Sequence, residues 1–431
     1  MYKRYESYKD SGIEWIGEIP EHWSTSKIKY QADINSKTLN EKTPEIFEIE
    51  YLDISNVDSD GKIIKMEPML FRDAPSRARR VVSDGDTLVS TVRTYLKAIT
   101  WLNKVENNLI CSTGFAVLSP KKTIEPKYLS YLVRSPLYVE EIVSRSVGVS
   151  YPAITSTEIG NLECIMPPQN TNYINEQKTI ANYLDKKTSE VDSLIADKEE
   201  LIKKLEEYKQ SIITEAVTKG LNPDVKMKDS GIEWIGEIPE HWEFIPLRWL
   251  INIKNGDSIS RDEYIEKGII PIYGGNGIIS FTDKSNVNYK TIVMGRVGAL
   301  CGNVHYVEHD KAWISDNAMY LSSWDNNKVS LKYLELIMRA LKLNDYASKT
   351  AQPLITGETV KRQSIPLPPI DEQHKLINYI VKINKTNETL SADNSNQIQN
   401  LKKYRQSLIY EAVTGKIDVR DFQPERSEQL A

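Results

Sequence analysis

The chain has 431 residues, more than one ordinary hydrophobic core accommodates, so two or three domains are expected. Its 40% hydrophobic and 27% charged residues are normal for a globular protein, and no apolar run is long enough to span a membrane. The net charge of −5 excludes a strongly basic nucleic-acid-binding protein, so any DNA contact must come from local clusters or from a basic partner. No secretory signal is visible, and three scattered cysteines (Cys111, Cys164 and Cys301) fit packed thiols in a reducing cytoplasm.

The string KDSGIEWIGEIPEHW occurs twice, at Lys9–Trp23 and at Lys228–Trp242. It is too long and too varied to recur by chance, so the chain is predicted to contain two copies of one unit. A long helix is also predicted in each unit, as described below. We expect the apolar side chains of each string to pack the domain of its own unit onto the far end of the long helix of the other unit. In the first string these side chains are Trp15, Ile16, Ile19 and Trp23.

The first variable region follows, and it is rich in predicted strands. The runs EIEYLDISNV, DGDTLVSTV and STGFAVLSP are bounded by Gly, Asp and Pro, and PKYLSYLVRS is a short predicted helix. Two basic clusters, FRDAPSRARR and STVRTYLKA, and the loop SYPAIT (Ser150–Thr155) could contact nucleic acid, although a surface or salt-bridge role is the alternative for each arginine. The candidate DNA-binding residues here are Arg72, Arg77, Arg79, Arg80, Arg93, Tyr95, Lys97 and Tyr151.

A long segment then repeats at a different offset. Glu176–Thr218 aligns with Glu372–Thr414 without a gap, and 18 of 43 positions are identical. Apolar residues recur with a period near 3.5, which predicts two helices that pair as a coiled coil, and Gly220 and Gly415 are the expected stops. The alternative is that each helix packs only on its own domain. The predicted seam residues are Leu194, Leu201, Leu205, Tyr208 and Ile212, then Leu390, Leu401, Tyr404 and Leu408.

The second variable region has other letters but a similar plan. Strands are predicted in GIIPIYGGNGIISF, KTIVMGRVGALCGNVHYV and NAMYLSS, followed by the helix LKYLELIMRALK and the loop AQPLIT (Ala351–Thr356). Arg can bond guanine, Asn or Gln can bond adenine, and Gly allows close approach of the backbone to a ligand. The candidate DNA-binding residues are Tyr273, Gly275, Asn276, Arg296, Asn303 and Gln352.

Enzyme motifs are missing. The sequence contains neither GxxxxGK[ST] nor GxGxxG, and the two Pro-Pro pairs lack the flanks of an adenine-methyltransferase motif. HYVEH (His305–His309) matches an inverted zinc motif, but its flanks predict a strand, in which the two histidines would lie about 13 Å apart. We therefore predict no catalytic residue and no metal site.

The order of these pieces resembles the specificity subunit of type I restriction-modification enzymes. The resemblance covers nearly the whole chain and rests on GIEWIGEIPEHW, YGGNGIISFTD, GRVGALCGNVHYV and KQSIITEAVTKG. It implies an α+β protein with two target-recognition domains, at opposite ends of an antiparallel coiled coil of two long helices with a pseudo-two-fold repeat. The expected boundaries are 1–166 for target-recognition domain 1, 167–221 for the central helix, 222–367 for target-recognition domain 2, and 368–431 for the C-terminal helix and tail.

The resemblance also implies a function and partners. The chain would be a non-catalytic subunit that reads a bipartite, asymmetric double-stranded DNA target, one half-site per domain. The helices would set the spacing and dock two adenine-methyltransferase subunits, which bind S-adenosylmethionine, and up to two restriction subunits that use ATP and Mg would join them. The chain itself would carry no cofactor. A self-sufficient enzyme and a coiled-coil adaptor that binds only protein are the alternatives.

Overall fold

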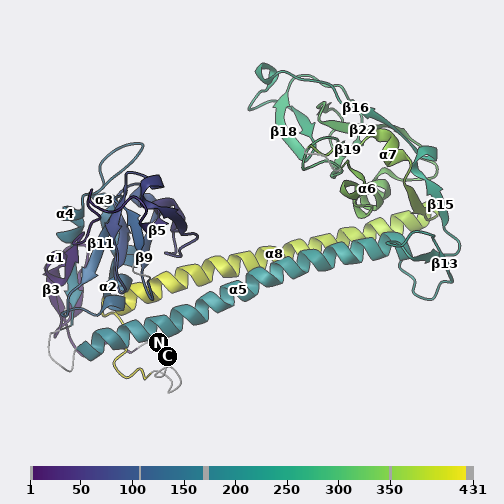
Figure 1. Ribbon diagram of the computed structural model, residues 1–431. Helices are drawn as coiled ribbons and strands as arrows, with labels where there is room; N and C mark the ends of the chain where they lie inside the picture. The colour runs from purple at the N-terminus through teal and green to yellow at the C-terminus, as the bar shows by residue number, and fades with distance from the viewer. Residues whose placement is uncertain (1–2, 106–107, 168–173, 349–351, 424–431) are drawn as a thin grey trace. The chain divides into compact units, whose positions relative to one another are not determined.

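The computed structural model describes residues 3–105, 108–167, 174–348 and 352–423. It divides into two compact units: unit 1 contains residues 1–198 and 396–431, and unit 2 contains residues 199–395. Each unit joins a β-rich domain to one half of each of two long helices (Figure 1). Ala351, the first residue of the second predicted loop, lies outside the described residues. None of the helices in the described ranges is long and apolar enough to cross a membrane.

The domain of unit 1 contains two four-stranded sheets, in the orders β6-β5-β10-β7 and β4-β11-β8-β9, and two strand pairs, β1-β2 and β3-β12. The strands are β1 (Tyr8–Asp10), β2 (Glu18–Pro20), β3 (Ser24–Lys27), β4 (Ala32–Ile34), β5 (Glu48–Leu52), β6 (Glu67–Leu70), β7 (Ala78–Val81), β8 (Thr87–Ser90), β9 (Ile99–Trp101), β10 (Leu109–Ser112), β11 (Phe115–Pro120) and β12 (Glu163–Met166). The short helices are α1 (Ile28–Gln31), α2 (Pro126–Arg134), α3 (Pro136–Ser144), α4 (Ser156–Gly160), η1 (Ile54–Asn56), η2 (Phe71–Asp73) and η3 (Thr94–Leu96).

The domain of unit 2 has the sheets β16-β22-β19-β20 and β18-β17-β21 and the pairs β13-β14 and β15-β23. The strands are β13 (Met227–Asp229), β14 (Glu237–Pro239), β15 (Glu243–Pro246), β16 (Ile251–Asn255), β17 (Ile270–Gly274), β18 (Gly277–Thr282), β19 (Thr291–Gly295), β20 (Val304–Val307), β21 (Trp313–Ile314), β22 (Ala318–Trp324) and β23 (Ser364–Leu367). The short helices are α6 (Leu331–Ala340), α7 (Gly357–Lys361), η4 (Leu247–Trp249), η5 (Arg261–Glu263) and η6 (Leu343–Tyr346).

The two domains share most of their topology, although the second sheet has four strands in domain 1 and three in domain 2. In each domain an antiparallel strand pair, β3 with β12 or β15 with β23, includes the last strand before a long helix. The four-stranded antiparallel sheets β4-β11-β8-β9 and β16-β22-β19-β20 have equivalent strand orders. The other sheet contains one parallel pair in each domain, β5 with β10 and β17 with β21. The sequence repeats outside the variable regions thus frame two copies of one α+β fold, as predicted. The strand predicted for HYVEH is also confirmed, as β20.

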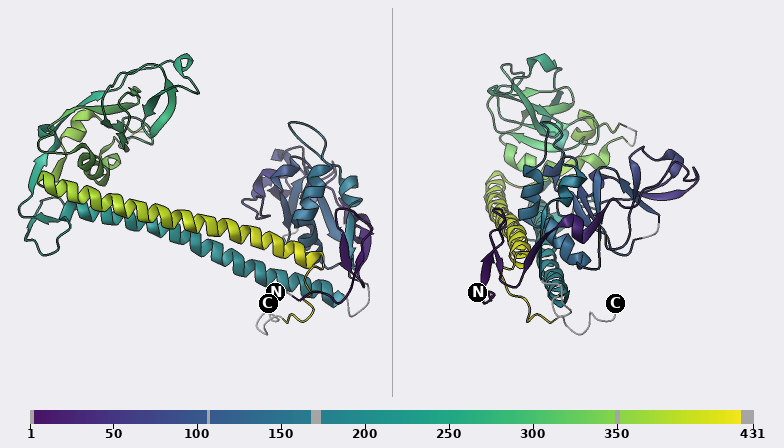
Figure 2. Two further views of the ribbon diagram at one scale, coloured as in Figure 1. Left: turned by 180° about the vertical axis from the view of Figure 1, so that it is seen from behind. Right: turned by 90° about the vertical axis from the view of Figure 1, so that its left-hand side faces the viewer.

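The long helices are α5 (Ile174–Lys219) and α8 (Ile370–Val413), and they lie side by side (Figures 1 and 2). They are antiparallel: in unit 1, Asp192 of α5 pairs with Arg405 of α8 at 2.9 Å, whereas in unit 2 the end of α5 shares a core with the start of α8. The expected stops are confirmed, because Gly220 and Gly415 follow the helices with left-handed φ values of 79° and 70°.

The seam between the helices agrees with the predicted one at Leu408 and differs from it at most other positions. The buried positions include Val191 and Ile195 on α5 and Ile398 and Leu408 on α8. Five predicted seam residues are instead 43–62% exposed: Leu194, Leu201, Tyr208, Leu390 and Tyr404.

Polar residues inside the seam explain this error. Asn387 and Asn394 are buried, and each side-chain amide donates a hydrogen bond to a carbonyl one turn earlier in α8, Ile383 and Leu390 respectively. The buried amide groups are therefore hydrogen-bonded, so their burial carries no penalty for a missing partner. These two polar residues occupy seam positions where a coiled-coil pattern predicts apolar residues. The neighbouring, exposed stripe has the same apolar spacing, and this is why the sequence pattern predicted it as the seam.

The opening string packs at the end of the other copy's helix, as predicted. Ile16, Ile19 and Trp23 share a buried cluster with Val413 at the end of α8. The indole N–H of Trp23 donates to the Glu176 carboxylate at 3.2 Å. The second copy repeats this arrangement: Trp242 donates to Glu372 at 3.1 Å and lies beside Gly220, after the end of α5.

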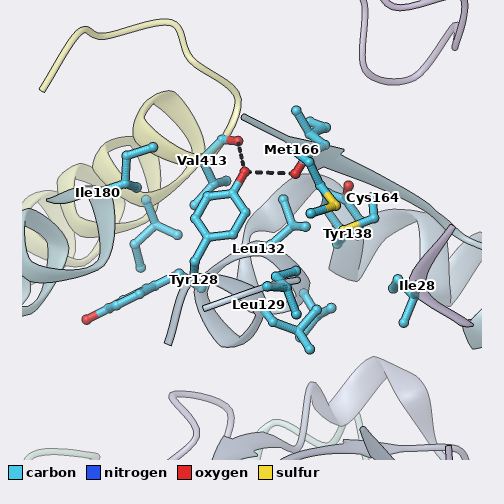
Figure 3. Packing of buried hydrophobic residues seen from close by; sticks show 14 of the residues in the cluster. Ile28, Tyr128, Leu129, Leu132, Tyr138, Cys164, Met166, Ile180 and Val413 are labelled. Atoms are coloured by element: carbon cyan, nitrogen blue, oxygen red, sulfur yellow. Dashed lines mark hydrogen bonds between the residues drawn. The ribbon is translucent and has the colours of Figure 1, made fainter. Parts of the chain in front are cut away.

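One tyrosine in each domain fastens the short helix to the long one. The Tyr128 hydroxyl lies 2.9 Å from the Ile165 carbonyl and 3.4 Å from the Val413 carbonyl (Figure 3). The Tyr333 hydroxyl occupies the equivalent place, 2.8 Å from the Pro366 carbonyl and 3.1 Å from the Val217 carbonyl. Each domain is therefore packed directly on the C-terminal end of one long helix.

We expect Trp23→Ala to destabilise unit 1 by about 3–5 kcal/mol, because a fully buried indole is removed and the Glu176 carboxylate loses a donor. Urea unfolding of the whole chain measures this change. Trp249→Ala is the matched control, since its side chain is 69% exposed, and it should change the free energy of unfolding by less than about 0.5 kcal/mol. Equal effects of the two substitutions would contradict the packing role of Trp23.

Candidate nucleic-acid interface

Two loops in domain 1 lie against each other. Residues 90–98 connect β8 to β9, and residues 147–155 connect α3 to α4. Val92 and Ala153 form a β-bridge, the Arg93 amide donates to the Pro152 carbonyl at 2.8 Å, and the Ile154 amide donates to the Thr91 carbonyl at 2.9 Å. The backbone thus brings the loop that carries Arg93, Tyr95 and Lys97 against the loop that carries Tyr151.

The side chains of this loop pair are exposed and mix positive charge with aromatic rings. The Arg93 guanidinium stacks over the Tyr151 ring, with 4.5 Å from its carbon to the ring centroid. Tyr95 is 50% and Tyr151 is 60% exposed. The buried Thr94 hydroxyl bonds the Ser146 hydroxyl at 2.7 Å and so ties η3 to the end of α3. Such a surface suits stacking and hydrogen bonding to a nucleic acid.

Domain 2 repeats the same backbone arrangement. Val297 and Leu354 form the β-bridge, the Gly298 amide donates to the Pro353 carbonyl at 2.8 Å, and the Ile355 amide donates to the Arg296 carbonyl at 3.0 Å. The ends of the first loop are also joined in the same way in both domains. The Ser90 amide donates to the Ala98 carbonyl at 3.0 Å, and the Gly295 amide donates to the Asn303 carbonyl at 2.9 Å. Residues 295–303 are therefore the structural equivalent of residues 90–98.

The side chains on the second loop pair differ from those on the first. The Asn303 amide donates to the Asn276 side chain at 2.9 Å and accepts a longer bond of 3.4 Å from Asn344. Gly275 permits this approach, because an added Cβ would lie 3.3 Å from the Gly295 Cα. Domain 2 thus presents amides where domain 1 presents cations and rings. Arg296 lies beside them, its guanidinium 3.3 Å from the Asp316 carbonyl, and Gln352 is exposed on the adjoining loop.

Tyr273 does not join this surface. Its side chain is 5% exposed and belongs to a buried cluster, and its hydroxyl lies 3.2 Å from the His309 ring. The ring of Tyr273 therefore packs inside domain 2, and its predicted DNA contact stays a prediction.

The arginines of the 71–80 cluster lie on another part of domain 1, on η2, on β7 and between them. Arg77 pairs with Asp53 at 2.8 Å and bonds the Tyr51 hydroxyl, Arg79 stacks on Phe71 at 4.8 Å, and Arg80 lies 3.3 Å from the Thr38 hydroxyl. Arg72 pairs with its neighbour Asp73, 3.6 Å away, and has no other ion pair or side-chain hydrogen bond with the described residues. The other three arginines each contact residues of their own domain.

The charge state of Asp53 agrees with this structural role. Burial alone would raise its pKa, but hydrogen bonds from Tyr51 and Ser55 and the charge of Arg77 outweigh burial and hold the pKa below its usual value. The Asp53 carboxylate is therefore charged at neutral pH and keeps Arg77 in place. Within the described ranges, no three or more His, Cys, Asp or Glu side chains gather as a metal site would require, and all three cysteines are buried and unpaired.

Comparison with known proteins finds similarity to one group of DNA specificity proteins. Residues 239–400 match the model of the type I restriction modification DNA specificity domain. The specificity subunit of the MjaVIII type I restriction enzyme of Methanocaldococcus jannaschii is 24% identical over 341 residues, which cover 74% of this chain and 76% of that protein. The specificity subunit of EcoKI from Escherichia coli K12 is 24% identical, over 71% of this chain and 69% of that protein.

Solved structures agree in fold. A chain from a type I restriction-modification system, determined for its complex assembly and conformational transition, superposes with a TM-score of 0.71 at 22% identity, over 93% of this chain and 99% of that one. The HsdS subunit of Thermoanaerobacter tengcongensis gives 0.51 at 23% identity, over 93% and 98%. In its matched domain, in sequence and in fold, the chain is similar to the DNA specificity (HsdS) subunits of type I restriction-modification systems.

Sequence reasoning missed three parts of this surface: the equivalence of the two loop pairs, helix α3, and Asn344. Only the PxIT letters of the second loop in each pair indicated a correspondence between the domains. The other equivalence rests on backbone hydrogen bonds, which the residue letters do not reveal.

Proposed function

We propose that the chain reads a bipartite, asymmetric DNA target, with region 1–166 reading one half-site and region 222–367 the other. The observation that carries this proposal is the pair of equivalent loop surfaces with unlike side chains. Residues 90–98 carry Arg93, Lys97 and Tyr95, and residues 295–303 carry Arg296 and Asn303, with Asn276 bonded to Asn303. One backbone geometry with two side-chain sets is suited to presenting two different patterns of donors and acceptors to base edges.

In this proposal the helical segments, 167–221 and 368–431, set the distance between the half-sites. Each domain is fastened to a helix end through Tyr128 or Tyr333, which supports a fixed spacing. Readers that enter the major groove from one face of DNA are spaced by about 34 Å or multiples of it. The gap between the half-sites would therefore follow the length of the paired helices.

The exposed stripe of the helices is the proposed docking surface for two methyltransferase subunits. Leu194, Leu201 and Tyr208 are spaced by seven residues on α5, and Leu390 and Tyr404 occupy the equivalent positions on α8. Large apolar side chains exposed at regular spacing on a helix support a protein interface, and equivalent stripes suit two identical partners. Leu408 is buried, and Ile212 and Leu401 are half-buried, so these three predicted residues belong to the core and the seam rather than to the proposed docking surface.

The remaining chemistry would belong to partners. The methyltransferase subunits would bind S-adenosylmethionine and methylate adenine, and up to two restriction subunits would supply ATP- and Mg-dependent translocation and cleavage. The similar fold of a chain from a type I assembly supports these partners. The chain would contribute the sequence preference and the scaffold.

Genome-wide mapping of adenine methylation tests the proposal. Cells that express the cognate methyltransferase subunit are compared with and without this chain. We expect one split motif that appears only when the chain is present. A stable complex that produces no new methylation and prefers no DNA sequence would contradict DNA reading and would support the protein-only adaptor.

A further inference from the structure

We propose that Arg93 reads a guanine in the half-site of domain 1, with Tyr151 holding its guanidinium in place. This inference rests on the proposed function, because it assumes that domain 1 reads a half-site. It adds one reading residue and the base that this residue selects.

The backbone at Arg93 is the first observation. Arg93 and Lys97 have φ values of 51° and 57°, in the left-handed region that glycine adopts without cost. Their equivalents in domain 2 are both glycines, Gly298 with φ 79° and Gly302 with φ 82°. Glycine would satisfy the same loop geometry in domain 1. A cationic side chain at this strained position therefore indicates a role for the side chain itself.

The two cations of the loop have different surroundings. Lys97 lines a cavity of about 110 Å³ together with Arg134 and Glu140 of its own domain and Arg405 of α8. Arg93 does not line that cavity. Its guanidinium stacks on the exposed Tyr151 at the surface that the two loops form together. Arg93 is thus the cation placed for a ligand outside the chain.

The hydrogen-bonding groups of the Arg93 guanidinium are available to a ligand. Within the part of the chain that the structure describes, Arg93 makes no side-chain hydrogen bond or ion pair, whereas Arg77 and Arg80 have partners in the same domain. Stacking on a ring orients the guanidinium plane and leaves the N–H groups at its edge available. A planar pair of donors held in one orientation is suited to a ligand with two adjacent acceptors.

Guanine is the base that offers such acceptors. Its major-groove edge presents O6 and N7, both acceptors, and arginine bonds them bidentately. Adenine presents the acceptor N7 beside the N6 amino group, which is a donor. Arginine has no acceptor, so it cannot take a hydrogen bond from that amino group. A phosphate would also attract Arg93, but a phosphate contact changes affinity without selecting a base.

The test uses the full chain with its methyltransferase partner and maps methylated sites for the wild type, Arg93→Gly, Arg93→Lys and Tyr151→Leu. We expect Arg93→Gly to keep the fold, since Gly298 holds the same backbone place in domain 2. We expect Arg93→Gly and Arg93→Lys to relax one G·C position of the domain 1 half-site, with a loss of discrimination of about ten- to a hundredfold. Tyr151→Leu should relax the same position to a smaller degree, and the other half-site should stay unchanged.

Several outcomes would overturn the inference. Uniformly weaker methylation with an unchanged motif would show a phosphate contact, and relaxation at an A·T position would show that the base is not guanine. An unchanged motif at unchanged strength would show no contact. A wild-type chain that yields no split motif would instead refute the proposed function itself, a result distinct from these three. Gly298→Arg is the control, and it should alter only the half-site of domain 2. An added Cβ there meets no atom within 4 Å, and the left-handed φ of 79° imposes on the new arginine the same kind of backbone strain that Arg93 carries at φ 51°.

Discussion

Exchanging residues 24–154 for the corresponding region of another specificity subunit is expected to replace one half of the methylated motif and leave the other half and the gap intact. The exchanged segment lies wholly in unit 1 and contains both members of the loop pair, 90–98 and 147–154. It starts after Trp23, so the opening string keeps its contacts with α8. It ends inside the PxIT loop, before the Thr155 side chain that caps α4.

Methylation mapping checks this exchange, and the structure defines what the donor region must retain. An aromatic hydroxyl is needed at position 128, because Tyr128 joins domain 1 to the Val413 carbonyl of α8. The mirror exchange of residues 243–355 in domain 2 is the matched control, and it should replace only the other half of the motif. If either exchange altered both halves, the two domains would not read independently.

The sequence predicted the repeated strings and the helix ends better than it predicted the loop surfaces at 90–98 and 295–303. Identical letters at Lys9–Trp23 and Lys228–Trp242 show that two copies exist, and their buried Trp23 and Trp242 confirm that these letters encode packing. Packing at a helix end depends on particular side chains, so it leaves a visible trace in the sequence. The helix stops at Gly220 and Gly415 were predictable for the same reason, because few residues other than glycine adopt left-handed φ values without cost.

The equivalence of the loops could not be predicted, because it rests on the backbone. Residues 90–98 and 295–303 share one identical position of nine, Val92 with Val297, and yet they make the same bridge and the same amide-to-carbonyl bonds. Every residue except proline carries the same backbone donor and acceptor, so the side chains are free to differ. The fold therefore places the fewest constraints on residue type in the surface that would read DNA.

The seam register escaped prediction for the opposite reason. The letters there are constrained, but two neighbouring faces of each helix carry apolar residues, and only one of them is buried. Leu194 and Leu201 fit a heptad as well as Ile195 and Ile202 do. Single-chain pattern reasoning cannot separate a face that packs within the chain from one available to a partner, because both bury apolar surface in the end.

Lengthening both helices by one heptad is expected to change the gap and preserve both half-sites. Seven residues inserted after Glu199 of α5 and seven after Ser395 of α8 fall at equivalent positions of the two repeats, at the boundaries between the units. The insertion must be made in both helices, because α5 and α8 are antiparallel and a single insertion would leave seven residues without a partner. Seven residues add about 10 Å of helix, the length of about three base pairs.

The gap should therefore grow by up to about three base pairs. Because the DNA turns once in about 10 base pairs, the longer gap also rotates one half-site by about 100°, so methylation should weaken while the motif halves stay the same. Mapping methylated sites for the lengthened chain measures both effects. Insertions of five residues at the same two points are the control, since five breaks the seven-residue register and should lower the unfolding temperature and abolish methylation. An unchanged gap after the seven-residue insertions would show that the paired helices do not set the spacing, and the distance between half-sites would then have to be fixed by the partner subunits.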